Sequence, residues 1–288
     1  MASVPLSDLR ARIAALEGRA RGAAVSTSAP AGESAAETVP APGASSGMPR
    51  FDASVLERLY PQGARPEGTV HDLVCAHHRD TGALTGFAAA LIARMGADAG
   101  PVVWVTDAVT AGETGGLYGP GLAAFGIDPA RLLLVTAKSP AEALWAMEEA
   151  LSVPHLAAIV GEIGGAPRVL DLTATRRLAL RAERRGTPVL LLRPAGPDTA
   201  SAARVRLTLA PRPSGPDPHG LAVLGRPGFS IRLTRNRGGP TGAVDLEVRP
   251  HDHGFVPRPA HPLPVAAEAG DRPARPGAAE IVALRTAS

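Results

Sequence analysis

A strand-to-helix connection near the start of the sequence has the residue types of a degraded phosphate loop. The apolar run 69–75 leads through AHHRD into a helix-forming stretch, which is where nucleotide-binding α/β proteins place their phosphate loop. Such a loop needs glycines for close backbone approach, a lysine to neutralise the phosphates and a Ser or Thr for the metal. The five residues at this place are Gly82, Ala83, Leu84, Thr85 and Gly86.

No lysine is available for this loop. Of the 30 basic residues, 29 are arginine, and the single lysine, Lys138, follows a later apolar run. The sequence therefore predicts a dismantled nucleotide site, with no catalytic residue and no cofactor.

Histidines beside the loop raise the question of a metal site. The three candidate ligands of the loop are His77, His78 and Asp80. Adjacent histidines in a strand-to-helix loop are typically solvated, and we apply the same interpretation to His251 and His253. The lone cysteine, Cys75, leaves no cysteine cluster for zinc. We therefore expect no metal site.

Two carboxylates end apolar runs at places where a nucleotide hydrolase keeps acidic residues. Asp107 lies at the carboxyl end of its predicted strand, the edge where open parallel sheets bind ligands. Without a phosphate loop, we interpret Asp107 as a turn-forming residue. Glu162 follows Gly161, which contributes no ligand, and we interpret Glu162 as a surface carboxylate.

The elements that would position these residues alternate along the chain. Short apolar runs are separated by helix-length stretches, and runs that are apolar on both faces indicate a covered parallel sheet. Ser139 is a good N-cap, with Pro140 at the first helical position and Glu142 completing a capping box. The three central runs are Val102 to Ala108, Leu132 to Ala137 and Leu156 to Ile163.

The second half continues this pattern and ends in a hairpin. A basic helix with Leu172, Leu178 and Leu180 among its apolar residues is closed by Gly186. A buried strand, TPVLLLRP, follows it. The next segment, RVRLTLAP, alternates polar and apolar residues and predicts a strand with one solvent-exposed face. FSIRLTRN and AVDLEV flank a Gly-rich turn and predict an antiparallel hairpin. The predicted fold class is therefore α/β.

The two ends of the chain differ from this core. Residues 1–22 predict an amphipathic helix whose apolar stripe is Leu9, Ile13 and Leu16, docked on its own domain or on a partner. Residues 23–47 have the composition of a flexible linker, and residues 256–288 that of a disordered tail. No apolar stretch reaches membrane length and the N-terminus lacks a hydrophobic signal core, so we expect a cytoplasmic protein without a membrane anchor.

The phrases DPARLLLV, ALWAMEEAL and RNRGGPTG, taken with the strand series, resemble the ImuA family of RecA-like proteins over residues 48–255. The resemblance implies a RecA-like core with a mostly parallel central sheet flanked by helices and a C-terminal antiparallel hairpin. It also implies work with the ImuB pseudo-polymerase, with an error-prone DNA polymerase indirectly, and with RecA in SOS-induced translesion synthesis.

Where RecA carries its phosphate loop and catalytic carboxylate, this sequence has Gly82-Ala83-Leu84 and Val109. The resemblance thus implies a non-catalytic adapter. The matching RecA hairpin carries a basic-Asn-basic triplet that reaches the neighbouring subunit's nucleotide. The same pattern here, formed by Arg235, Asn236 and Arg237, implies a partner contact that caps RecA filaments; ordinary surface charge or weak contact with DNA phosphates stays open.

Two other classes of protein remain alternatives, and self-association stays open in each. One is a SulA-type cell-division inhibitor, which would bind the division GTPase rather than RecA. The other is a RecA-like nucleotide-dependent DNA-binding ATPase, which would bind nucleotide saturably.

Overall fold

The computed structural model describes residues 54–61, 63, 65–66, 68–96, 100–196, 199–214, 225–249 and 254–258. The predicted N-terminal helix with Leu9, Ile13 and Leu16 lies outside these residues. So do the linker at 23–47, His251, His253 and residues 259–288 of the predicted tail. Residues 256 and 257, predicted to open that tail, belong instead to the last strand of the sheet.

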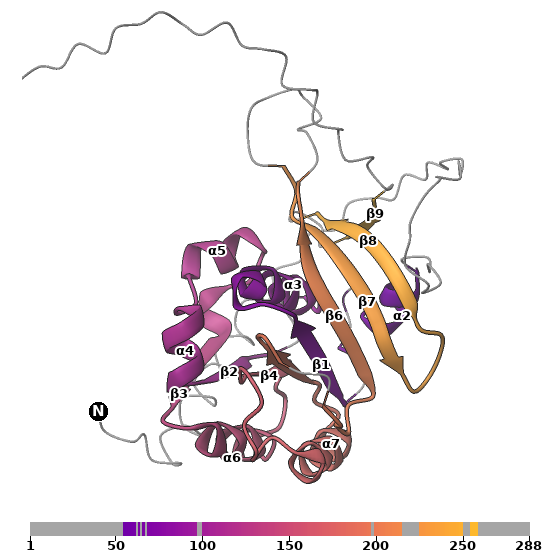
Figure 1. Cartoon of the computed structure of the whole chain (residues 1–288). Helices are drawn as coiled ribbons and strands as arrows, with labels where there is room; N and C mark the ends of the chain where they lie inside the picture. Colours follow the sequence, from indigo (N-terminus) through magenta and orange to yellow (C-terminus); the bar gives the residue numbers. More distant parts are fainter. Residues whose placement is uncertain are drawn as a thin grey trace, which may run out of the picture.

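A nine-stranded mixed sheet forms the centre of the described structure, in the order β3-β2-β4-β5-β1-β6-β7-β8-β9 (Figure 1). The first six strands in this order pair in parallel, and β6 to β9 pair antiparallel. The fold is thus α/β with a C-terminal antiparallel part, as predicted. The strands are β1 (Val70–Cys75), β2 (Val102–Asp107), β3 (Leu132–Ala137), β4 (Ala158–Glu162), β5 (Val189–Arg193), β6 (Val205–Arg212), β7 (Gly228–Asn236), β8 (Gly242–Val248) and β9 (Phe255–Pro257).

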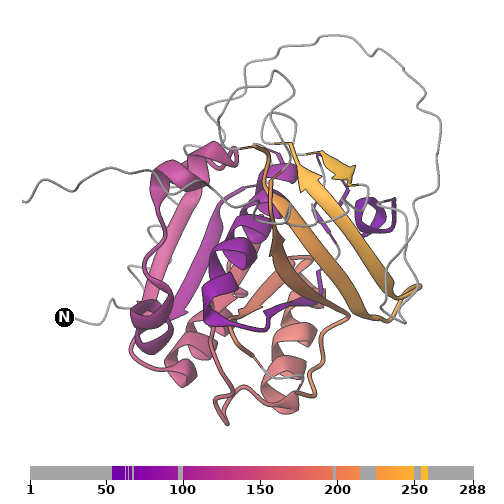
Figure 2. The same ribbon diagram turned by 45° about the horizontal axis from the view of Figure 1, so that its top comes forward.

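Helices cover both faces of the parallel half because its strands are apolar on both sides. One buried cluster joins α2 and α3 to the sheet, and a second joins α6 and α7 to the opposite face. Figures 1 and 2 show α6 and α7 on one side and α3 on the other. The helices are α2 (Ser54–Leu59), α3 (Thr81–Arg94), α4 (Ala108–Thr114), α5 (Gly119–Ala124), α6 (Pro140–Ala150) and α7 (Leu172–Arg185), with 3-10 turns η1 (His78–Asp80) and η3 (Pro129–Arg131). Among the described helices none is long and apolar enough to cross a membrane.

Helix α6 begins where the capping pattern predicts. The Ser139 hydroxyl accepts from the backbone N–H of Glu142 at 3.3 Å. The Glu142 carboxylate accepts in return from the backbone N–H of Lys138 at 3.1 Å, one residue before the cap. The first bond satisfies one donor that the helix start would leave open, and the second ties the preceding residue back to α6 and fixes the turn after β3.

Helix α7 buries a different face from the one expected. Only Leu178 of the three predicted apolar leucines is buried, whereas Leu172 is 50% and Leu180 45% exposed. The buried positions are otherwise small, such as Ala174 and Ala182, which lets the helix approach the sheet closely. Gly186 ends the helix in the left-handed conformation (φ 63°), as predicted.

The predicted hairpin is β7 with β8, and its register pairs Ile231 with Val244. Strand β6 departs from the expected wet face because Arg206 is buried, at 3% exposure. Its guanidinium pairs with the Asp72 carboxylate of β1 at 2.8 Å, and a buried charge is tolerated when it is paired in this way. A register shift between Arg206 and Leu207 marks the same place in the β6–β7 pairing.

Candidate functional site

A cavity of about 220 Å³ lies at the carboxyl ends of the parallel strands, and we call it the carboxyl-edge cavity. Open parallel sheets bind ligands at this edge. The cavity lies between the start of α3 and the segment from α4 to α5, and both figures show α5 beside α3. Its described lining residues are Thr81, Gly82, Thr85, Gly86, Ala89, Thr114, Gly115, Gly116, Leu117, Tyr118, Gly121, Leu122, Phe125 and Glu162.

The five residues of the predicted phosphate loop are helical. Helix α3 begins at Thr81, so Gly82, Ala83, Leu84, Thr85 and Gly86 all lie in its first two turns. The actual connection from β1 is short and holds the single 3-10 turn η1. It has no glycine that would let it widen around a phosphate.

An aromatic ring occupies the space over this part of the helix. A Cβ placed on Gly86 would lie 3.1 Å from the Phe125 ring, so the glycine allows ring and helix to touch. None of the fourteen described lining residues is Lys, Arg or His, and the one charged side chain is Glu162. The cavity therefore offers a phosphate group no side-chain cation.

Glu162 is not the surface carboxylate that we expected, because only 4% of it is exposed. Strand β4 lies between β2 and β5, and its neighbours cover its end. The carboxylate accepts from Trp104 Nε1 at 3.4 Å and from Thr114 Oγ1 at 3.2 Å. Burial raises the pKa of Glu162, the two hydrogen bonds lower it, and the nearby charge of Asp107 raises it; the pKa lies above its ordinary value.

Asp107 has the turn-forming role that the sequence predicts. It caps α4 by accepting from the backbone N–H groups of Val109 and Thr110, both at 3.1 Å. It also accepts from the Thr110 hydroxyl at 2.6 Å, and that hydroxyl in turn accepts from the backbone N–H of Gly164 at 2.8 Å. Val109, which stands where the resemblance places a catalytic carboxylate, is 63% exposed.

The histidines beside η1 do not converge on a metal site. His78 Nδ1 lies 3.6 Å from the Glu113 carboxylate, and Asp80 lies 4.0 Å from the Arg79 guanidinium. Within the described ranges, no group of three or more His, Cys, Asp or Glu side chains is arranged to hold a metal. Cys75 is buried, and this burial raises the pKa of its thiol.

The three residues of the basic-Asn-basic triplet have different positions. The Arg235 guanidinium donates to the carbonyl of Ser201 at 2.8 Å, so it is committed to its own domain. Asn236 closes the β7–β8 turn by donating to the carbonyl of Pro240 at 3.1 Å. Arg237 is the exposed member of the triplet, whereas Arg235 and Asn236 are half-buried.

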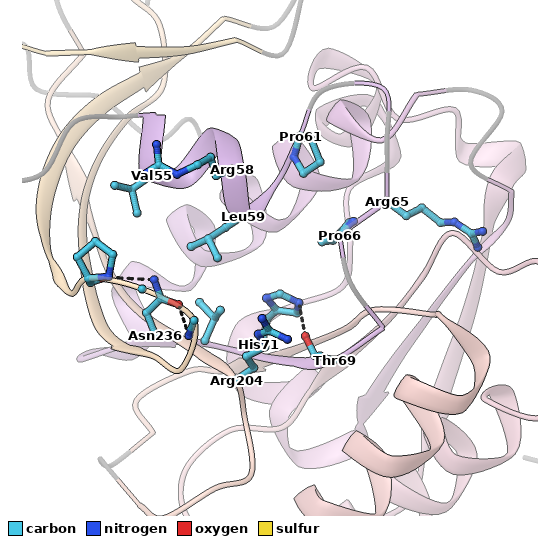
Figure 3. Close-up of a pocket in the computed structure, with 14 residues that line it drawn as sticks. Val55, Arg58, Leu59, Pro61, Arg65, Pro66, Thr69, His71, Arg204 and Asn236 are labelled. Atoms are coloured by element: carbon cyan, nitrogen blue, oxygen red, sulfur yellow. Dashed lines mark hydrogen bonds between the residues drawn. The ribbon is translucent and has the colours of Figure 1, made fainter.

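A second cavity, of about 310 Å³, lies at the other end of the sheet, and we call it the amino-edge cavity (Figure 3). It opens between α2, the start of β1 and the β7–β8 turn. The sequence reasoning found only its Asn236. Its described lining residues are Val55, Arg58, Leu59, Pro61, Arg65, Pro66, Thr69, His71, Arg204, Val205, Asn236, Gly238, Gly239 and Pro240.

Comparison with known proteins identifies the family. No protein-family profile matches the chain. The chain is 37% identical over 254 residues to Protein ImuA of Caulobacter vibrioides strain NA1000 / CB15N, with 81% of this chain and 96% of that protein covered. The same values hold for Protein ImuA of Caulobacter vibrioides strain ATCC 19089 / CIP 103742 / CB 15. The chain belongs to the ImuA family.

This ImuA family member also holds a buried polar network that sequence reasoning missed. Asp72 accepts from the Ser201 hydroxyl at 2.6 Å and from Arg206 Nη2 at 2.8 Å. The carbonyl of Thr199 accepts from the same Arg206 atom at 2.6 Å. Because Ser201 also holds Arg235, the network connects β1, the segment before β6 and the hairpin. An Asp inside an apolar strand was the signal available in the sequence.

Proposed function

We propose that this chain is a non-catalytic, RecA-like adapter in SOS-induced translesion DNA synthesis and mutagenesis. Membership of the ImuA family supports a role in the ImuA/ImuB mutagenesis cassette. The partners proposed are the ImuB pseudo-polymerase and RecA, with the error-prone polymerase reached indirectly. The adapter works in the cytoplasm, where these partners meet DNA.

The observation that carries the non-catalytic part is the chemistry of the carboxyl-edge cavity. Phosphoryl transfer depends on cations and oriented donors that stabilise the charge of the transferring group, and each is worth about 3 kcal/mol or more. The cavity supplies no Lys, Arg or His among its described lining residues, and its one charged group is a carboxylate. Residues Gly82 to Gly86 are helical and Phe125 covers Gly86, so a phosphate-binding loop has no room here.

An ATP hydrolysis assay tests this part. We expect the purified full chain to turn over ATP at the buffer rate, with or without single-stranded DNA. The matched variant is Gly82→Glu, because a Cβ at Gly82 meets no heavy atom within 4 Å and the fold should tolerate the change. Turnover well above background in the parent that Gly82→Glu abolishes would show that the cavity is an active nucleotide site.

A binding assay tests the adapter part. Immobilised chain should retain purified ImuB and RecA of the same organism. Retention of the division GTPase without ImuB or RecA would support the SulA-type alternative instead.

The proposed filament cap depends on Arg237, because Arg235 already donates to Ser201. Arg237→Ala should weaken binding to RecA filaments loaded with a nonhydrolysable ATP analogue more than binding to ImuB. Arg232→Ala, which removes another exposed arginine, on β7, is the matched control. Equal RecA affinity for Arg237→Ala and the parent would leave Arg237 as ordinary surface charge.

A further inference from the structure

The amino-edge cavity has a charge pattern opposite to that of the carboxyl-edge cavity. Three arginines, Arg58, Arg65 and Arg204, and one histidine, His71, are among its fourteen described lining residues. None of those fourteen is Asp or Glu. Arg58 is exposed at its rim and Arg204 is half-buried, whereas the Arg65 side chain points away from the recess (Figure 3). A concave surface lined by positive charges raises the local concentration of anionic ligands.

Apolar walls distinguish this cavity from a surface patch of arginines. Six of the fourteen lining residues are Val, Leu or Pro. Figure 3 shows Leu59, His71 and Asn236 around one recess, with Pro61 and Pro66 along its far side. Ligand sites combine apolar walls with a few polar groups that fix orientation, and about 310 Å³ is within their usual range.

The walls of the recess are held in place by contacts within the chain. His71 is buried between the Tyr60 hydroxyl and the Thr69 hydroxyl, each 3.1 Å from one ring nitrogen. Arg65 donates to the carbonyl of Leu156 at 2.8 Å. On the opposite side, Asn236 accepts from the backbone N–H of Gly238 at 3.1 Å. A recess formed in advance loses little conformational entropy when a ligand binds.

We propose that the amino-edge cavity binds an acidic peptide segment of a partner protein, with one apolar side chain in the recess and the flanking carboxylates at Arg58 and Arg204. Guanidinium groups match carboxylates through paired hydrogen bonds. This inference deepens the proposed adapter role and rests on it, because an adapter needs a site that recognises its partner.

A peptide explains both halves of the lining, whereas a phosphodiester backbone explains one. Phosphate groups would satisfy the arginines but would leave Val55, Leu59 and the proline walls without an apolar partner. Acidic side chains on either side of a leucine or phenylalanine satisfy the arginines and the walls together.

The test uses fluorescence polarisation with three labelled probes and the purified full chain. One probe is a synthetic octapeptide with one leucine flanked on both sides by aspartates. The second has lysines in place of the aspartates, and the third is a single-stranded oligothymidylate. We expect the acidic peptide to bind, the lysine peptide not to bind, and the affinity to fall as added salt shortens the screening length toward about 3 Å at 1 M.

Arg58→Glu is the informative variant, because Arg58 is exposed and donates to the Ser54 hydroxyl at 3.3 Å, so the change leaves the core untouched. It should weaken binding of the acidic peptide roughly tenfold or more, since it replaces an attraction with a like-charge repulsion. Arg176→Glu changes net charge equally at an exposed site on α7 and should have no effect.

Three outcomes would overturn the assignment. They are an acidic peptide that fails to bind at about 1 mM, an affinity equal in Arg58→Glu and parent, and an oligothymidylate that alone binds and is lost in Arg58→Glu. The last outcome would make the recess a nucleic-acid site. Because binding is measured directly, these results are independent of ATP turnover and of ImuB retention, which test the proposed function itself.

Discussion

Breaking the buried ion pair between Asp72 and Arg206 is expected to cost more stability than any surface change. Asp72 has no exposed surface and Arg206 is 3% exposed. The Asp72→Ala variant removes the carboxylate oxygen that accepts from Arg206 Nε at 3.1 Å and from its Nη2 at 2.8 Å. The carbonyl of Thr199 and the Ser201 hydroxyl remain as acceptors, but neither carries a counter-charge.

A buried charge that loses its partner typically costs about 3–5 kcal/mol. We expect Asp72→Ala to lower the free energy of unfolding by this amount. Removing both charges in Asp72→Ala with Arg206→Leu should cost less than Asp72→Ala alone. The pair carries its own desolvation cost, and Oδ1 of Asp72 has no hydrogen-bond partner among the described residues.

Urea unfolding followed by far-ultraviolet circular dichroism measures these differences, and the four proteins of the double-mutant cycle give the coupling energy. Arg177→Ala is the control, because its pair with Glu148 is made by a guanidinium that is 54% exposed. Such pairs contribute about 0–1 kcal/mol. If Asp72→Ala lies within about 1 kcal/mol of the parent, like the control, the argument from an uncompensated buried charge is wrong.

Three further changes test contacts at the carboxyl ends of β3 and β4. The raised pKa of Glu162 means that the folded state holds this proton more tightly than the unfolded chain, so its contribution to stability falls as pH rises from below 4.5, the ordinary value, through the folded pKa. Glu162→Gln removes this dependence. In urea unfolding repeated at increasing pH across that window, the variant should gain stability relative to the parent, and a constant difference would contradict the pKa shift. Gly161→Ala places a Cβ against Met147 Sδ, in van der Waals overlap, and should cost about 1–3 kcal/mol, recovered in part by Met147→Val; no recovery in the double variant would contradict overpacking at this contact. Ser139→Ala removes the cap on α6 and should cost about 1 kcal/mol in thermal unfolding, and an unchanged midpoint would show that Glu142 alone holds the turn.

Local patterns were enough to predict most elements of the fold. Short runs that are apolar on both faces, such as Val102 to Ala108, became the covered strands of the parallel sheet. Ser139 and Gly186 mark helix ends because their chemistry depends on neighbours within a few residues. The turn-forming interpretation of Asp107 succeeded for the same reason.

The residues whose environment the sequence does not predict are those whose neighbours depend on the order of the strands in the sheet. Glu162 follows Gly161 in sequence, but its burial comes from Trp104 of β2 and Thr114 of α4. The alternating pattern of its strand predicts that Arg206 is solvent-exposed, but β1 lies beside β6 and places Asp72 next to it, so Arg206 is buried in an ion pair. Residues Gly82 to Gly86 have the composition of a loop, but they are helical because the connection from β1 is shorter than a phosphate-binding loop and α3 begins at Thr81.

The position of Lys138 has a practical consequence. This exposed residue begins the turn after β3, and it carries the single side-chain amine of the 288-residue chain. Acylating dyes and amine-reactive crosslinkers therefore find one side-chain target, and a lysine-specific endoprotease finds one cleavage site. Because Glu142 fixes the backbone N–H of Lys138 at 3.1 Å, the rate of that cleavage reports how often this one turn opens.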